Sequence, residues 1–180
     1  MGFLKKNELE NLGFSQIGDN VLISDKCSIY NPSKISIGSN VRIDDFCILS
    51  AGENGIKIGN NVHIACYVSL IGKESIDIGN FVGISSKTAV YSSSDDYSGN
   101  YLTGPTVDEK FKNVDHRKVK FEEHVIIGSQ CVILPGVTIK EGTAIGSFSL
   151  VSKDVDSWGI YVGAPLKFLK SRSKDMLDFL

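Results

Sequence analysis

Ile37-Gly38-Ser39-Asn40-Val41-Arg42-Ile43 is the first of four similar stretches in this sequence of 180 residues. The pattern returns at 58–64, 78–84 and 127–133, with Cys131 in place of the valine in the last stretch. A fixed short period of this kind is the signature of a repeat architecture. Isoleucine or a close substitute recurs at a step that is usually six residues: Ile17, Ile23, Ile29, Ile37, Ile43, Ile58, Ile64, Leu70, Ile78, Ile84 and Val90.

A six-residue step favours strands over helices, because 3.6 residues per turn would rotate successive isoleucines off any single helix face. Short strands joined by tight turns fit the step, and three hexads would make about one coil of a triangular prism. Each strand would turn a β-branched side chain inward, while glycine takes a corner conformation that a Cβ would penalise and asparagine beside it tolerates the left-handed region. An ordinary β-sandwich is the alternative, but sandwich strands recur irregularly at about 8–12 residues.

The repeat is interrupted once. It stops after Val90 and resumes near Val119, which predicts a long inserted loop over 91–118. Loops of this length are usually functional or disordered, and the aromatic residues, paired acids and histidine in this one favour a functional loop over a solvated insertion that contacts another subunit. We expect an N-terminal helix over 1–14 and a capping helix over 165–180, which complete one domain over 1–180.

The composition excludes several functional classes. Lys and Arg total 19 against 21 Asp and Glu, so the net charge of −2 gives no general reason to bind nucleic acid or an anionic membrane. The first residues lack the apolar stretch of a secretory signal, and no run of residues is long and apolar enough to span a membrane. We therefore expect a cytoplasmic protein without nucleic-acid or membrane partners.

The four cysteines, Cys27, Cys47, Cys66 and Cys131, form neither a C-x-x-C pair nor the dense spacing of a small secreted scaffold. Cys27 and Cys47 each follow a hexad isoleucine by four residues, and Cys131 replaces a valine of the repeat. We expect buried, reduced thiols that pack in the core.

Three C-terminal motifs extend the repeat: Ile-Leu-Pro-Gly-Val-Thr-Ile at 133–139, Val-Ser-Lys-Asp-Val at 151–155 and Gly-Ala-Pro at 163–165. With the hexads, they resemble the hexapeptide-repeat acyltransferases, which include the galactoside and maltose acetyltransferases. The resemblance covers nearly the whole chain. It implies an all-β solenoid that is a left-handed parallel β-helix, a homotrimer of prisms packed side by side, and acetyl-CoA as co-substrate in the groove between neighbouring C-terminal coils.

The resemblance also implies the residues that bind acetyl-CoA. Backbone groups around Gly128, Ser129, Gly146 and Ser147 would hydrogen-bond the pantetheine arm and the thioester carbonyl, with the glycines permitting a close approach. Pro165 would pack near the adenine. Basic side chains suit the phosphates, and the candidates, for which a solvated surface is the alternative, are Lys153, Lys167, Lys170 and Arg172.

The inserted loop carries Ser-Ser-Ser-Asp-Asp-Tyr-Ser-Gly at 92–99, which resembles acetyltransferases that modify sugars, including nucleotide-linked amino sugars for bacterial surface polysaccharides. Sugar O-acetyltransferases have a catalytic histidine there, in a Tyr-x-x-x-His-Pro setting. Aligning on Tyr91 puts Asp95 at that position. A hydroxyl acceptor is hard to activate and favours a histidine base, whereas a neutral amine is already a strong nucleophile, so a carboxylate can suffice.

The sequence therefore predicts an N-acetyltransferase that acts on a nucleotide-linked amino sugar, with sugar O-acetylation as the alternative reaction. The candidate catalytic residues are Asp95, His116 and Asp96. His116 stands beside Asp115 and Arg117 in the return limb of the loop. Either aspartate could bind the acceptor ammonium, orient His116 or remove the proton, and the alternative for both is a polar turn held by side-chain hydrogen bonds.

Two functions of other classes remain as alternatives. A zinc carbonic anhydrase needs three converging histidines, but the spacing of His63, His116 and His124 lacks the ligand pattern of that family, so we expect no metal. A binding solenoid without catalysis would have no use for the C-terminal motifs that resemble a coenzyme A site.

Overall fold

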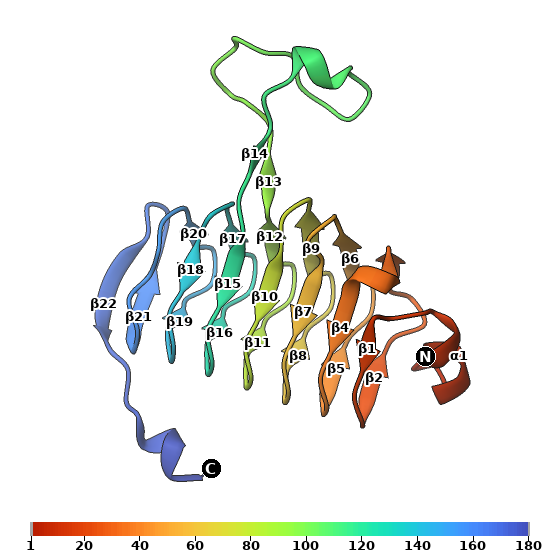
Figure 1. Ribbon diagram of the computed structural model, residues 1–180. Helices are drawn as coiled ribbons and strands as arrows, with labels where there is room; N and C mark the ends of the chain where they lie inside the picture. The colour runs from red at the N-terminus through yellow and green to blue at the C-terminus, as the bar shows by residue number, and fades with distance from the viewer. Residues whose placement is uncertain (1, 180) are drawn as a thin grey trace.

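The computed structural model describes residues 2–179. Apart from a two-stranded sheet in the inserted loop, its strands form three sheets that run side by side along the axis of a parallel β-solenoid (Figure 1). The first sheet contains β1 (Gln16–Ile17), β4 (Ile35–Ile37), β7 (Ile56–Ile58), β10 (Ile76–Ile78), β15 (Val119–Phe121) and β18 (Thr138–Ile139). The second contains β2 (Val21–Ile23), β5 (Val41–Ile43), β8 (His63–Ile64), β11 (Gly83–Ile84), β16 (Ile126–Ile127), β19 (Ala144–Ile145), β21 (Gly159–Val162) and β22 (Lys167–Ser171). The third contains β3 (Ser28–Tyr30), β6 (Ile48–Ala51), β9 (Ser69–Gly72), β12 (Ala89–Tyr91), β17 (Val132–Ile133) and β20 (Leu150–Val151).

From β1 to β20, apart from the two strands of the inserted loop, successive strands belong to successive sheets, so the chain turns three corners in each coil. We call the corner between the first and second sheets the first corner, that between the second and third sheets the second corner, and that between the third and first sheets the third corner. Equivalent residues of neighbouring coils pair in parallel register, as Ile37 does with Ile58 and Ile58 with Ile78. The six-residue period therefore predicted the fold correctly.

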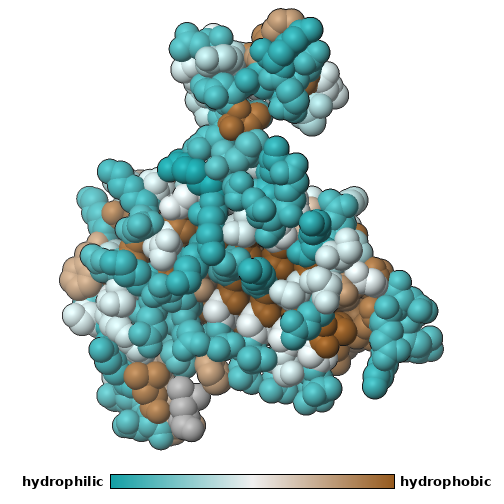
Figure 2. Space-filling model, in the orientation of Figure 1, coloured by the Kyte–Doolittle hydropathy of each residue, from teal (hydrophilic) through white to brown (hydrophobic). Residues whose placement is uncertain are grey.

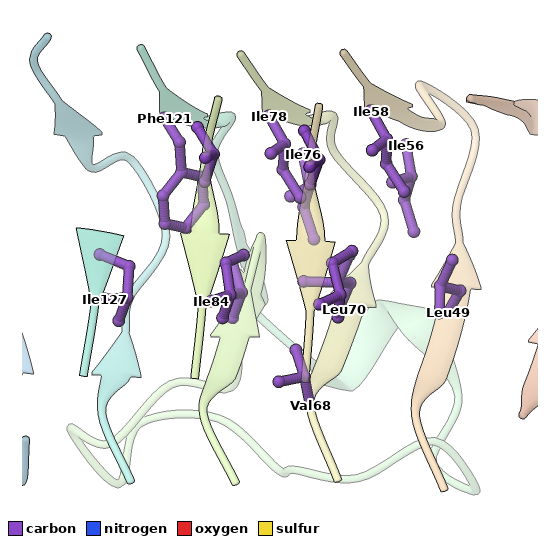
Figure 3. Close-up of a cluster of buried hydrophobic side chains, with 14 of the residues drawn as sticks. Leu49, Ile56, Ile58, Val68, Leu70, Ile76, Ile78, Ile84, Phe121 and Ile127 are labelled. Atoms are coloured by element: carbon purple, nitrogen blue, oxygen red, sulfur yellow. The ribbon is translucent and has the colours of Figure 1, made fainter. Parts of the chain in front are cut away.

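The inward residues of the three sheets form continuous apolar columns. Ile58, Ile78 and Phe121 stack in one of them, and each is almost completely buried (Figure 3). Burial of one such side chain contributes about 1.5–3 kcal/mol to the stability of the folded protein. The fold therefore requires an apolar residue at each inward position, which produces the six-residue period. Cys47 and Cys131 are fully buried in the columns, Cys27 and Cys66 are half-buried, and all four thiols are free, so their prediction as packing residues is confirmed for the buried pair.

The corner residues partly correct the sequence prediction. Asn40 and Asn61 adopt the left-handed conformation at the first corner, with φ of 58° and 57°, as expected. Gly38 does not have a positive φ; a Cβ on it would lie 2.7 Å from the carbonyl oxygen of Gly59 in the next coil. The glycine is required because neighbouring coils stack closely there, and not because of its backbone torsion.

The fourth repeat lies at a different corner from the other three. Gly38, Gly59 and Gly79 follow strands of the first sheet, whereas Gly128 follows β16 in the second sheet. The insertion hides this shift of one face, because the same short pattern serves both corners.

The ends of the solenoid are covered differently from one another. Helix α1 (Lys6–Asn11) lies within the predicted N-terminal helix. The prediction of a helix over 165–180 is wrong in its first part, because β22 pairs antiparallel with β21, Val162 opposite Lys167. The last coil leaves the backbone groups of β21 without a further parallel strand, and β22 satisfies them. A short 3₁₀ helix, η3 (Asp175–Phe179), follows. None of the helices within residues 2–179 could cross a membrane.

Candidate active site

The inserted loop leaves the solenoid at the third corner on a short antiparallel stalk. Its strands are β13 (Ser93–Ser94) and β14 (Asp115–His116), with Ser93 opposite His116. The head of the loop carries the 3₁₀ helix η2 (Glu109–Phe111) and stands clear of the solenoid on a narrow neck (Figures 1 and 2). The stalk fixes the positions of residues beside it relative to the coils.

The two candidate aspartates differ in their hydrogen bonds. Asp96 accepts bonds from the amide and hydroxyl of Ser98 and from the side-chain amide of Asn113, which is 3.2 Å away. The hydrogen bonds from Ser98 hold the pKa of Asp96 below its usual value. Asp95 is exposed and accepts only one long contact, 3.5 Å from the amide of Gly104. Asp96 therefore holds the loop together, and Asp95 has the carboxylate that a substrate can reach.

His116 is oriented by the strand opposite. Its Nδ1 lies 2.7 Å from the hydroxyl oxygen of Ser93, which in turn accepts a hydrogen bond of 2.8 Å from the amide of Lys73. Asp115 instead pairs with the guanidinium of Arg117, at 2.9 and 2.6 Å. The group that orients His116 is therefore Ser93, and not Asp95 or Asp96 as the sequence had suggested.

Asp95 and His116 line one cavity of about 440 Å³ at the base of the loop. Ser93, Ser94, Lys73 and Lys112 also line it. The ammonium group of Lys112 is bound to Glu109 at 2.7 Å. Lys73 and Lys112 were not predicted from the sequence, because isolated lysines in a polar corner and in a loop carry no pattern. The cavity brings together the carboxylates of Asp95 and Glu109, the imidazole of His116 and two lysines, a set of groups that can take part in acid–base chemistry.

The four residues predicted to bind the pantetheine arm lie together at the second corner on neighbouring coils: Gly128, Ser129, Gly146 and Ser147. The amides of Gly128 and Gly146 donate to the carbonyls of Ile145 and Tyr161 within the sheet. The amide of Ser129 donates to the hydroxyl of Ser147 at 3.1 Å. These three donors already have partners inside the protein, so they differ from the open amides that the resemblance suggested.

The glycines at this corner also have another role than expected. A Cβ on Gly128 would lie 2.5 Å from the amide nitrogen of Ser147, and one on Gly146 would lie 2.6 Å from a methyl group of Val162. The close approach that they permit is between neighbouring coils.

The candidate phosphate ligands divide into two groups. Lys153, Lys167 and Lys170 are exposed, as is Pro165. Arg172 is different, because its guanidinium donates to the carbonyls of His124 and Gly142 at 2.8 and 2.9 Å. Burial lowers the pKa of Arg172. Its interactions hold the C-terminal segment on the first corner, so Arg172 is a structural residue.

One protomer does not bring the two halves of the predicted site together. Asp95 and His116 lie by the third corner, and Ser129 and Ser147 lie at the second corner, across the whole width of the third sheet. The chain crosses that sheet from Ser129 at the second corner to Pro135 at the third corner. This six-residue step corresponds to roughly 20 Å of extended chain. The other histidines lie apart as well: His63 is on the outer face of the second sheet, and His124 is buried at the first corner, stacked on Phe81.

A parallel β-helix with hexad columns, an inserted loop with a carboxylate and a corner built of Gly-Ser pairs defines a solenoid acyltransferase. No protein-family model matches the chain. A dTDP-4-amino-4,6-dideoxy-D-glucose acyltransferase from Escherichia coli is 46% identical over 178 residues, which are 99% of this chain and 93% of that protein. The chain belongs to this family of acyltransferases.

Solved structures agree. A serine-to-alanine mutant of AntD, an N-acyltransferase from Bacillus cereus, was crystallised with dTDP-4-amino-4,6-dideoxyglucose and coenzyme A. It is 48% identical, with a TM-score of 0.96 over 99% of this chain and 95% of that one. It has also been crystallised with dTDP and 3-hydroxybutyryl-CoA. A maltose O-acetyltransferase from Clostridium difficile shares the fold, at 20% identity and a TM-score of 0.58, with 94% of this chain and 75% of that one covered.

Proposed function

We propose that this chain transfers an acyl group from coenzyme A to the amine of a nucleotide-linked amino sugar, in the synthesis of bacterial surface polysaccharide. The observation that carries the proposal is the accessible carboxylate of Asp95 in the cavity beside the stalk. The family relationship supports it, since the E. coli relative is named for a dTDP-linked 4-amino sugar and AntD was crystallised with that sugar nucleotide.

The reaction needs two kinds of assistance. The neutral amine attacks the thioester carbonyl, the carbonyl oxygen gains negative charge, and the C–S bond breaks once the C–N bond has formed. The amine nitrogen must lose a proton, and the departing thiolate can take one up. A carboxylate that binds the incoming ammonium and accepts its proton is sufficient for this step, because the neutral amine is a strong nucleophile.

We assign the carboxylate to Asp95. AntD has been crystallised, with dTDP and coenzyme A, as variants of one aspartate and of a serine ten positions before it. Two pairs at the start of the loop region have this spacing, Ser85 with Asp95 and Ser86 with Asp96. Asp96 is bound to Ser98 and Asn113, and Ser86 accepts a bond from Cys66, so Ser85 with Asp95 is the pair that remains available.

His116 serves as a second polar group of the same cavity, where we propose that it positions the acceptor or carries its proton. For the donor, we keep the second corner as the pantetheine site, with Ser147 and the backbone of Gly128, Ser129 and Gly146 as its surface. Lys153, Lys167 and Lys170 would bind the phosphates, and Pro165 would contact the adenine.

A homotrimer would join the two halves of this site. The outer face of the third sheet, which separates them, carries the row Ile48, Ser69, Ala89, Val132 and Leu150. The corresponding row of the first sheet carries Ser36, Lys57, Asp77, Lys120 and Thr138. We propose that the apolar face packs on a second copy, so that the second corner of one protomer faces the loop of its neighbour. Both proposed substrates are intracellular metabolites, so we place the reaction in the cytoplasm.

Thiol release tests the proposal. The purified protein is incubated with acetyl-CoA or 3-hydroxybutyryl-CoA and, in turn, dTDP-4-amino-4,6-dideoxyglucose, UDP-linked amino sugars and simple galactosides. We expect turnover with a nucleotide-linked amine. Turnover only with hydroxyl acceptors would overturn the assignment of an amine. If calorimetry shows no binding of coenzyme A at millimolar concentration, the proposal that the chain is an acyltransferase is wrong. Sedimentation velocity should give the mass of a trimer.

A further inference from the structure

Gly83 differs from every other glycine of the chain. The sequence has 18 glycines, and all of them lie within the described residues 2–179. Each of the others has a positive φ or would place a Cβ at 3.0 Å or less from another atom. Gly83 has neither constraint, because a Cβ on it would meet only the side chain of Ile126, at 3.9 Å. The fold therefore does not require glycine at this position.

Glycine is also unfavourable at this position. Gly83 is the first residue of β11, and glycine in a strand loses more backbone freedom on folding than a residue with a side chain. A strand glycine often marks a place where a ligand or another backbone comes close. Since no backbone of the described chain comes close to Gly83, the position suits a ligand.

The empty position faces outward on the second sheet. Ile84 and Ile127 point into the core (Figure 3), so the residues before them, Gly83 and Ile126, face outward. The outer row of this sheet contains Arg42, His63, Gly83, Ile126, Ala144 and Ile160. Gly83 thus interrupts a row of side chains. This row lies on a different face from the third sheet, which we propose as the contact between copies.

The empty position lies beside the proposed site of acyl transfer. Gly83 and Ser85 face the same side of the strand and are two residues apart, which corresponds to roughly 7 Å. The amide of Ser85 donates to the carbonyl of Ile127, so Ser85 lies next to the coil of Gly128, where the proposed pantetheine surface begins. An acyl group whose thioester carbon lies near Ser85 can therefore extend its chain back along the strand to Gly83.

The two walls of the empty position differ in polarity. On the side of the C-terminal coils stands Ile126, whose side chain is 46% exposed, followed by Ala144. On the other side stands His63, whose Nε2 lies 2.8 Å from the carboxylate of Asp44. Asp44 also accepts from the guanidinium of Arg42 at 2.7 Å. Burial opposes the charge of Asp44, but the bonds from His63 and Arg42 outweigh it, so the pKa of Asp44 lies below its usual value. The polar wall is therefore held in place before any ligand arrives.

We infer that Gly83 determines which acyl group the chain transfers. Its missing side chain admits a chain longer than acetyl, whose methylene groups contact Ile126 and whose polar substituent, such as a hydroxyl, reaches His63. A sugar ring suits the position less well, because the apolar wall offers no hydrogen bonds to its hydroxyls. The inference rests on the proposed function, because it names the class of acyl donor for that reaction: a short-chain acyl-CoA longer than acetyl-CoA.

Thiol release with a series of donors tests the inference. The intact protein is incubated with dTDP-4-amino-4,6-dideoxyglucose and acetyl-CoA, butyryl-CoA or 3-hydroxybutyryl-CoA. We expect the wild type to use the two longer donors with a kcat/KM at least equal to that for acetyl-CoA. Gly83→Val fills the position and should lower the ratio of kcat/KM for butyryl-CoA to that for acetyl-CoA by roughly tenfold or more. Gly83→Ala should lower the same ratio by less.

Ser36→Val is the matched control, because Ser36 is an outward strand residue on the first sheet. It should leave the ratio unchanged. Ile126→Ala should enlarge the position and raise the ratio of kcat/KM for hexanoyl-CoA to that for butyryl-CoA. Valine suits a strand, so Gly83→Val should fold. If it does not, Gly83→Ala and Ile126→Ala make the same test.

Several results would overturn the inference and leave the proposed function standing. They are a wild type that uses only acetyl-CoA, and a Gly83→Val variant that keeps the wild-type ratio. If Gly83→Val changed only the KM for the acceptor, the position would belong to the sugar, and if it changed the oligomeric state in sedimentation velocity, the position would be a contact between copies. No thiol release with any donor would overturn the proposed function and this inference together.

Discussion

The hydroxyl oxygen of Ser93 lies 2.7 Å from Nδ1 of His116 and accepts the amide hydrogen of Lys73. The hydroxyl can donate to Nδ1 or accept from it through its second lone pair, so the bond orients the imidazole in either tautomer. We therefore propose that His116 positions the substrate and that Asp95 removes the proton.

Ser93→Ala tests the role of this bond. We expect kcat to fall roughly tenfold, because the imidazole loses the group that sets its orientation. His116→Ala should lower kcat at least as far. An unchanged kcat in both variants would show that the histidine takes no part in the reaction.

The two aspartates should respond differently to removal of their charge. Asp95→Asn should lower kcat by roughly 100-fold or more, because the proton acceptor is lost. The thermal unfolding curve should be unchanged, because among residues 2–179 the carboxylate of Asp95 is bonded only to the amide of Gly104. Asp96→Asn should instead loosen the turn at Ser98 and raise KM for the acceptor. Steady-state kinetics of the two variants decides the assignment, and equal losses of kcat would contradict it.

The acid stability of the protein should depend on Asp44. Its carboxyl is charged at lower pH in the folded protein than in the unfolded chain, whose pKa is about 3.8. The stabilisation is therefore fully present above that value and is lost as the pH falls through the folded pKa. Thermal unfolding of Asp44→Asn and the wild type at neutral pH and below pH 3.8 should give a difference that narrows in acid. A constant difference would contradict the linkage.

The sequence predicts the columns of the solenoid well because the requirement is local. Each inward position accepts only a β-branched or similar side chain, so Ile37, Ile58 and Ile78 reveal the period. The corners are less readable, because Gly38 and Gly128 have the same neighbours in sequence but lie at different corners. Counting hexads from one glycine to the other would have distinguished the two corners, but the 28 residues between Val90 and Val119 interrupt the repeat.

The candidate site was predicted only in part, for a physical reason. Asp95 and Asp96 are adjacent and identical, and only the three-dimensional turn shows that Ser98 and Asn113 engage the second. Gly83 carries no signal in the sequence, because only the stacking of neighbouring coils shows that a side chain would find room there. Contacts within the folded loop decide the first case, and contacts between coils decide the second.

Coil stacking itself can be tested with two glycines near each other on the solenoid. A Cβ on Gly128 would lie 2.5 Å from the backbone of Ser147, whereas one on Gly83 would find its nearest neighbour, Ile126, at 3.9 Å. Gly128→Ala should lower the free energy of unfolding by about 1–3 kcal/mol, and Gly83→Ala should leave it nearly unchanged. Denaturant unfolding measures both, and equal stability of the two variants would refute the stacking role.

Arg172 and Lys170 offer a matched pair in the C-terminal segment. The guanidinium of Arg172 bonds the carbonyls of His124 and Gly142, and the ammonium of Lys170 is exposed. Arg172→Met should reduce the free energy of unfolding by about 2 kcal/mol or more, because it removes charged hydrogen bonds to the carbonyls of two buried residues. Lys170→Met should leave stability unchanged and raise KM for acyl-CoA by removing a phosphate contact. If Arg172→Met raised KM for acyl-CoA at unchanged stability, Arg172 would be a phosphate ligand after all.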